Sequence, residues 1–162
     1  MLQKLIVFYS YTGNIKKIAN MIKEKLDCDI LELESLIPFS NNYDEIVNEY
    51  QNNSINREVE IKDIKINLND YEEFIIGTPV WWYTISPVIT QFLKKYKLEN
   101  KTIYPFATNA GWLGHTFKDF EKLCINNNLK EGMNIVFDTN DLNKLITKDE
   151  EINSWINKIK ED

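Results

Sequence analysis

The fold is decided by the stretch LIVFYSYTGN, residues 5–14, which changes from apolar to polar within a few positions. Residues 2–9 are almost continuously apolar, which is typical of a central parallel strand that is covered on both faces. From Ile15 to Leu26, apolar residues recur at helical spacing and lysines occupy the other side. The sequence therefore predicts a strand, a short polar loop and then an amphipathic helix.

The loop between that strand and that helix has the composition of a phosphate-binding loop. The hydroxyl groups of Ser10 and Thr12 can donate hydrogen bonds, and Gly13 allows the backbone to turn close to a ligand. The N–H groups and the dipole at the start of a helix favour an anion. Serine and threonine are also common as caps in ordinary strand–helix turns, so the loop alone leaves both interpretations open.

Apolar strands and amphipathic helices alternate along the rest of the chain. Further strands are expected at residues 28–33, 74–77, 102–107 and 134–137, and helices at 87–96, 116–124 and 147–159. Pro105 lies inside one of these strands and lacks a donor, so we expect a bulge or pairing on one side only at that point. Residues 36–68 are expected to form a surface excursion with one helix, at 43–50. The alternation predicts a single α/β domain, residues 1–162, whose helices cover both faces of a doubly wound parallel sheet.

Composition and charge limit the partners. The chain has 162 residues and a formal net charge of −6, which disfavours nucleic acid and anionic membranes, although charge alone also fits mere solubility. No apolar run reaches bilayer length, and the N-terminus leads into the first strand without a signal peptide, so a cytoplasmic protein is expected. Cys28 and Cys124 lie in apolar patterns that indicate buried thiols, and with a single histidine, His115, no metal site is expected.

Three loops are expected to meet at one edge of the sheet. They span residues 10–14, 79–83 and 108–114, and ligands of doubly wound sheets bind beyond the carboxyl ends of the strands. Two of these loops carry Trp81, Trp82 and Trp112, which either stack on a flat ligand or close the end of the core. We expect one ring of the Trp81–Trp82 pair to close the core. A phosphate loop beside stacking rings and free backbone amides predicts a flavin mononucleotide (FMN) site.

These three motifs together resemble the flavodoxin family. The resemblance covers nearly the whole chain and is strongest at residues 9–14, 77–83 and 106–114. It is closest to the short-chain bacterial group whose aromatic loop reads roughly Thr-Pro-Val-Trp-Trp. It implies a five-stranded sheet in the order 2-1-3-4-5, which is the order found in flavodoxins themselves.

The resemblance also assigns the cofactor-binding residues. Ser10, Thr12, Gly13, Asn14 and Ile15 would hold the FMN phosphate, the stretch from Pro79 to Tyr83 would flank the isoalloxazine ring, and residues 108–111 would meet its pyrimidine edge through N–H groups. Trp112 would cover the ring or the ribityl chain. The full predicted set comprises Ser10, Tyr11, Thr12, Gly13, Asn14, Ile15, Thr78, Pro79, Val80, Trp81, Trp82, Tyr83, Thr108, Asn109, Ala110, Gly111, Trp112 and Gly114.

Two positions depart from the family pattern. Ile15 stands where members often have threonine, which removes one hydroxyl donor. Tyr83 stands where many relatives have glycine, next to the flexible peptide that responds to the flavin semiquinone. Because a bulky residue resists unusual backbone angles, Tyr83 argues against carrying over the family's one-electron tuning.

The resemblance implies a monomeric electron carrier that binds FMN and meets a reductase and acceptor enzymes transiently. The alternative is an FMN-dependent NAD(P)H oxidoreductase acting on quinones or nitro compounds, because residues 79–83 also resemble the flavin loop of that family. In that case His115 or Tyr83 would line the substrate pocket. A cofactor-free signalling receiver is disfavoured, because Tyr9-Ser10 and Thr78-Pro79 stand where it needs acidic residues.

Overall fold

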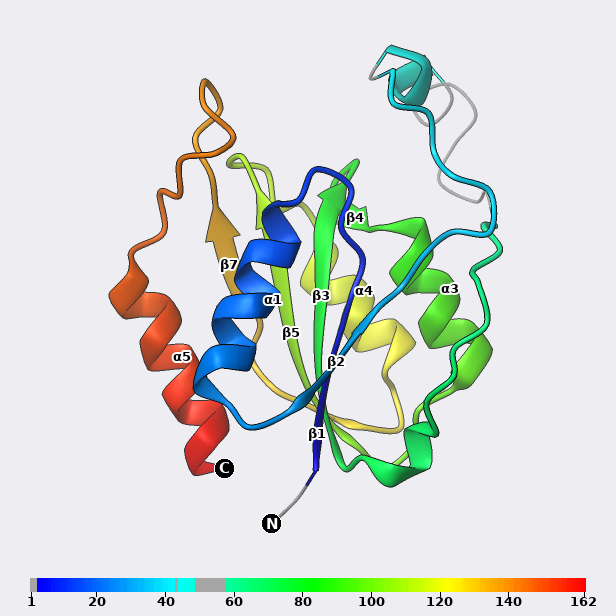
Figure 1. The fold of residues 1–162 in the computed structure, drawn as a ribbon, viewed down its shortest axis with the longest axis vertical. Helices are drawn as coiled ribbons and strands as arrows, with labels where there is room; N and C mark the ends of the chain where they lie inside the picture. The colour runs from blue at the N-terminus through cyan, green and yellow to red at the C-terminus, as the bar shows by residue number, and fades with distance from the viewer. Residues whose placement is uncertain (1–2, 43, 49–57) are drawn as a thin grey trace.

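The computed structural model describes residues 3–42, 44–48 and 58–162. Figure 1 shows a twisted sheet with helices on both faces. The strands are β1 (Lys4–Phe8), β2 (Asp29–Glu32), β3 (Glu73–Trp81), β4 (Thr84–Ile85), β5 (Thr102–Asn109), β6 (Asn128–Leu129) and β7 (Met133–Val136). The helices are α1 (Asn14–Lys25), α3 (Pro87–Tyr96), α4 (Thr116–Leu123) and α5 (Asp149–Glu161), with a 3-10 turn, η1 (Leu68–Asp70).

The strand order confirms the predicted doubly wound sheet. β2, β1, β3 and β5 lie side by side and pair in parallel, and both β6 and β7 pair in parallel with β5. The fifth position of the order 2-1-3-4-5 is thus divided between two short strands, of which the sequence predicted only the second. Gly132 lies in the break between them, where a Cβ would lie 2.5 Å from the Phe117 ring.

The break also accommodates the proline inside β5. Pro105 pairs with Ile76 of β3 on one side. On the other side, β6 reaches only as far as Ile103 and β7 begins opposite Phe106, so Tyr104 and Pro105 face the gap. The missing N–H of proline therefore falls where the neighbouring strand is interrupted, which confirms the expected pairing on one side only.

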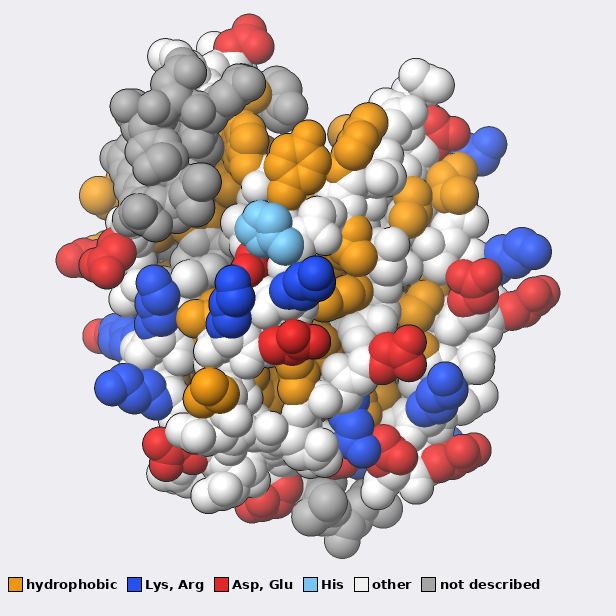
Figure 2. All heavy atoms as spheres, turned by 180° about the vertical axis from the view of Figure 1, so that it is seen from behind, with side chains coloured by type: hydrophobic (Ala, Val, Ile, Leu, Met, Phe, Trp, Pro, Cys, Tyr) orange, Lys and Arg blue, Asp and Glu red, His pale blue; other side chains and the backbone are white. Residues whose placement is uncertain are grey.

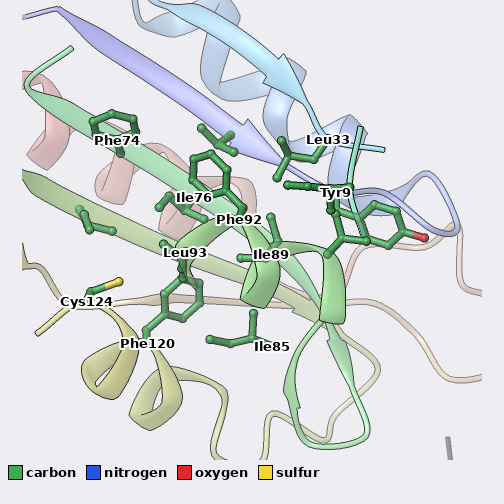
Figure 3. Close-up of a cluster of buried hydrophobic side chains, with 14 of the residues drawn as sticks. Tyr9, Leu33, Phe74, Ile76, Ile85, Ile89, Phe92, Leu93, Phe120 and Cys124 are labelled. Carbon is green, nitrogen blue, oxygen red and sulfur yellow. The ribbon is translucent and has the colours of Figure 1, made fainter. Parts of the chain in front are cut away.

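Each face of the sheet has its own core. On one face α1 and α5 contribute buried isoleucines, such as Ile18 and Ile156, that pack against β1, β3 and β5. On the other face, Figure 3 shows Phe92 of α3 and Phe120 of α4 clustered with Phe74 and Ile76 of β3. Within the described residues, no helix combines the length and the apolar character that crossing a membrane requires.

The excursion between β2 and β3 is partly described. Residues 44–48 are helical, and Ile46 is buried at 1 % exposure; the remainder of the helix predicted at 43–50 lies outside the described residues. Ser35 and Ile61 form an antiparallel bridge, and the N–H of Leu36 donates to the Glu60 carbonyl over 2.8 Å. The two ends of the excursion are therefore held together beside the core.

Candidate functional site

The carboxyl edge of the sheet contains a cavity of about 450 Å³ at the point where the three predicted loops meet. β1 and β3 lie side by side here, as do β3 and β5, so their following segments converge. Twelve of the predicted residues line the cavity: Tyr11, Thr12, Asn14, Pro79, Val80, Trp81, Trp82, Tyr83, Thr108, Asn109, Ala110 and Trp112. The volume lies within the usual range for small-molecule sites.

Three lining residues were missed by the sequence reasoning. Ile46 comes from the excursion, and Phe137 and Leu142 come from the segment that follows β7. Ile46 belongs to the predicted helix, but nothing in its spacing tells which part of the molecule that helix contacts. Phe137 is the last residue of the strand predicted at 134–137. The carboxyl ends of parallel strands lie at the same edge of the sheet, so this position in the sequence could have indicated that Phe137 lies near the cavity.

The other predicted residues lie beneath or beside the cavity rather than on its wall. The hydroxyl of Ser10 accepts a hydrogen bond from the Gly13 N–H over 3.0 Å, which closes the loop. Ile15 is 1 % exposed and packs into the core. The hydroxyl of Thr78 accepts from the Ser86 N–H over 2.9 Å and so ties β3 to the start of α3. Gly111 and Gly114 both have positive φ, at 115° and 62°.

One end of the cavity offers backbone donors. α1 begins at Asn14, directly after Gly13 with φ 98°, and has no side-chain cap. The first N–H groups of a helix have no acceptor within the helix, so they are available to an anion. A Cβ built on Gly13 meets nothing within 4 Å, so the space above the loop is open. The Asn14 side chain, by contrast, is engaged, because its Nδ2 donates to the Leu142 carbonyl over 2.9 Å.

The other side of the cavity is aromatic. Trp81 is 6 % exposed and contacts Tyr11, Phe39 and Trp82, with ring centroids 5.3, 5.2 and 5.5 Å away. Trp81 is therefore the ring of the pair that closes the end of the core, as expected. Trp82 is partly buried, whereas Tyr83 and Trp112 keep 54 % and 60 % of their surface exposed. Flat rings of this kind are suited to stacking on a planar ligand.

The residues of this wall belong to a hairpin rather than a simple loop. β3 continues to Trp81, which pairs with Thr84 of β4, and Trp82 and Tyr83 form the two-residue turn between them. Both turn residues are left-handed, with φ 47° and 68°. Tyr83 therefore adopts a backbone angle that its bulky side chain was expected to resist. Two-residue hairpins require this backbone twist, and the turn meets that requirement without glycine.

Contacts with the start of α4 hold the turn. The His115 N–H donates to the Tyr83 carbonyl over 2.8 Å. Gly114 lies so close that an added Cβ would be 2.4 Å from both the Cβ and the carbonyl oxygen of Tyr83. Left-handed backbone at a residue other than glycine costs about 1–2 kcal/mol. At Tyr83 the hydrogen bond from His115 and the close packing of Gly114 offset the cost of the left-handed backbone.

A polar cluster that the sequence did not predict lies beside the turn. His115 Nδ1 is 2.5 Å from Asp119 Oδ2, and the Thr84 hydroxyl donates to the same oxygen. Thr116, three residues before Asp119, is not part of this cluster, because its hydroxyl donates to the Leu113 carbonyl. The cluster fixes the His115 ring while 56 % of that side chain remains exposed.

Comparison with known proteins agrees with this architecture. The sequence profile of the flavodoxin family matches residues 3–159, so the chain belongs to the flavodoxin family. The comparison with curated proteins found no significant match.

Solved structures share the fold. A candidate flavoprotein from Bacteroides eggerthii is 24 % identical, with a TM-score of 0.79 and 98 % of each chain covered. A flavoprotein from Lactobacillus acidophilus, solved in complex with FMN, is 23 % identical, with a TM-score of 0.69 over 96 % of this chain and 99 % of that one. A flavodoxin, WrbA-like protein from Agrobacterium tumefaciens is 13 % identical, with a TM-score of 0.59 over 96 % of this chain and 91 % of that one.

Proposed function

We propose that the chain binds FMN in the cavity at the carboxyl edge of the sheet and carries electrons between redox proteins. The observation that carries the proposal is the convergence in one cavity of the uncapped start of α1 and of exposed rings from two other loops. Membership of the flavodoxin family supports it, as does the complex of the Lactobacillus acidophilus flavoprotein with FMN.

The residues of the cavity fit the parts of FMN. The backbone donors after Gly13 suit the phosphate, and the open space above that residue leaves room for it. Trp82, Tyr83 and Trp112 offer rings for the isoalloxazine. A Cβ on Gly111 also meets nothing within 4 Å, so there is room beside Gly111 for the pyrimidine edge, while the Gly111 N–H itself donates to Asn109 Oδ1. The bound flavin would supply the redox chemistry, and the protein positions it.

The lining favours a carrier over an enzyme. Among the described residues that line the cavity, none is Asp, Glu, His, Lys or Arg, so no acid–base pair faces the ligand. A carrier needs none, whereas turnover of a substrate commonly uses one. The exposed rings of Tyr83 and Trp112 at the rim would instead meet partner proteins through small, transient interfaces. We further propose a monomer that works in the cytoplasm with a separate reductase and acceptor enzymes.

The second candidate is an FMN-dependent NAD(P)H oxidoreductase for quinones or nitro compounds. The fold shared with the WrbA-like protein keeps this candidate open. His115, which this activity would use, lines a neighbouring cavity rather than the one at the carboxyl edge, whereas Tyr83 does line the latter.

Stopped-flow reduction of the FMN-loaded protein separates the two functions. We expect NADPH alone to leave the 450 nm flavin band unchanged over minutes, and addition of a flavodoxin reductase to bleach it. Bleaching by NADPH alone at a rate that saturates with NADPH, followed by reoxidation on addition of a quinone, would establish the oxidoreductase instead.

A further inference from the structure

A second cavity, of about 620 Å³, lies between α3 and α4. Figure 2 shows this face, with lysine side chains gathered below the histidine and hydrophobic side chains above it. The cavity shares Trp81 and Trp82 with the first one, but no residue of the 10–14 loop lines it. Of the fourteen described residues that line it, six are apolar and eight are polar or charged, so the cavity suits a ligand with both apolar and polar parts.

The two helices give this groove a direction. Both begin near the carboxyl edge of the sheet and run back along it (Figure 1), with Pro87 and His115 lining the groove where they start. Lys94 and Lys122 line it seven residues later on their respective helices. Seven residues correspond to about 10 Å along a helix, so both lysines start from backbone positions toward the end of the groove that is remote from the turn.

The two ends of the groove therefore differ in chemistry. At the start of the helices Trp82, Thr84 and His115 present a ring, a hydroxyl and an imidazole. At the remote end neither Lys94 nor Lys122 has an ion-pair partner among the described residues. The described lining contains two acidic residues, Asp119 and Glu58. The Oδ2 atom of Asp119 already accepts from the Thr84 hydroxyl and contacts His115.

We propose that this groove binds an elongated aromatic carboxylate, with its ring against Trp82 and its carboxylate between Lys94 and Lys122. The apolar body would cover Ile85, Pro87 and Leu123 on the floor and sides. Cations at one end of the groove and a ring near the start of the helices select for a molecule that carries an anion and an aromatic group at opposite ends. The groove shares Trp81 and Trp82 with the FMN cavity, but the inference does not rest on the proposed electron transfer.

The probe is 4-phenylbutyrate, in which three methylene groups separate a ring from a carboxylate. Isothermal titration of the full-length, FMN-loaded protein compares it with the neutral amide, 4-phenylbutanamide. We expect the acid to bind about tenfold more tightly than the amide, because two partly exposed ion pairs contribute a few-fold each. In Lys94→Gln/Lys122→Gln the acid should lose this advantage, while binding of the amide should not change.

Two further variants locate the site. Lys118→Gln removes the same charge from an exposed position of α4 that does not line the groove, and it should leave the affinity within twofold of wild type. Thr90→Tyr fills the groove and should abolish binding of acid and amide alike, with thermal melts confirming that each variant is folded. Amide NMR shifts should cluster at Thr90, His115 and Lys122.

Any of three results would overturn the inference. These are no binding of the acid at millimolar concentration, equal affinities of acid and amide, or a double variant that binds the acid as tightly as wild type. FMN binding is followed separately by flavin fluorescence, so a failure in the groove is distinguishable from a failure in the cofactor cavity.

Discussion

Replacing Gly114 by alanine should test how the start of α4 holds the Trp82–Tyr83 turn. The added Cβ would lie 2.4 Å from the Tyr83 Cβ and carbonyl oxygen and 2.6 Å from its Cα, and two of these atoms are backbone, which cannot rotate away. Gly114 also has φ 62°, where a side chain costs about 1–2 kcal/mol. Overpacking adds about 1–3 kcal/mol. Together these give a loss of about 2–5 kcal/mol in the free energy of unfolding.

Gly111 provides the matched control. A Cβ there meets nothing within 4 Å, so Gly111→Ala carries a backbone cost without a clash, although at φ 115° that cost is larger than at φ 62°. Urea denaturation of both variants, with the m-value unchanged, isolates the contact with Tyr83. We also expect Gly114→Ala to weaken FMN binding, because Tyr83 lines the cavity. If Gly114→Ala loses less than about 2 kcal/mol in the free energy of unfolding, the proposed restraint of the turn is wrong.

Three further predictions follow from particular contacts. Asn14→Ala removes the hydrogen bond to the Leu142 carbonyl. Hydrogen exchange of the backbone amides after β7 should therefore become roughly five- to tenfold faster, because such a bond contributes about 1 kcal/mol. Unchanged exchange would show that this hydrogen bond does not restrain the segment. The hydrogen bond to Asp29 and burial raise the pKa of Tyr71 from 10.0 to about 12. The contribution of the neutral Tyr71 side chain to stability is therefore complete below pH 10 and is lost as the pH rises towards 12. The urea midpoint of the protein should fall over that range, and it should fall less in Tyr71→Phe. Burial raises the pKa of the Cys124 thiol to about 12, so at pH 8 it should react with a disulfide reagent only after unfolding, and a fast reaction in the Cys28→Ser protein would contradict that.

Most of the fold could be predicted from hydrophobic periodicity, because parallel strands and amphipathic helices have distinct patterns. Pro105 also indicated where the pairing of β5 is interrupted, because proline lacks the backbone N–H that a strand donates to its neighbour. β6 could not be predicted, because two residues, Asn128 and Leu129, show no period. The hydroxyl of Thr147 accepts from the Val136 N–H, a contact that is set by tertiary packing and that the sequence around Thr147 does not predict.

The location of the candidate site could be predicted from the sequence, whereas many of its individual contacts could not. Strand order alone brings the three loops together, whichever side chains they carry. The left-handed turn at Tyr83 was not predictable, because its angles are imposed by β3–β4 pairing and by contacts with Gly114 and His115, which are remote in sequence. The second cavity depends on the packing of α3 against α4, about which the sequence of either helix says nothing.

The central claim is that uncapped backbone donors at the start of α1 and rings from two other loops form an FMN site. Equilibrium titration of the flavin-stripped protein with FMN, followed by flavin fluorescence and the visible spectrum, tests it most directly. We expect saturable binding of one FMN per chain, much weaker binding of riboflavin, which lacks the phosphate, and a perturbed flavin spectrum. A protein that leaves the FMN spectrum and fluorescence unchanged at saturating concentrations would contradict it.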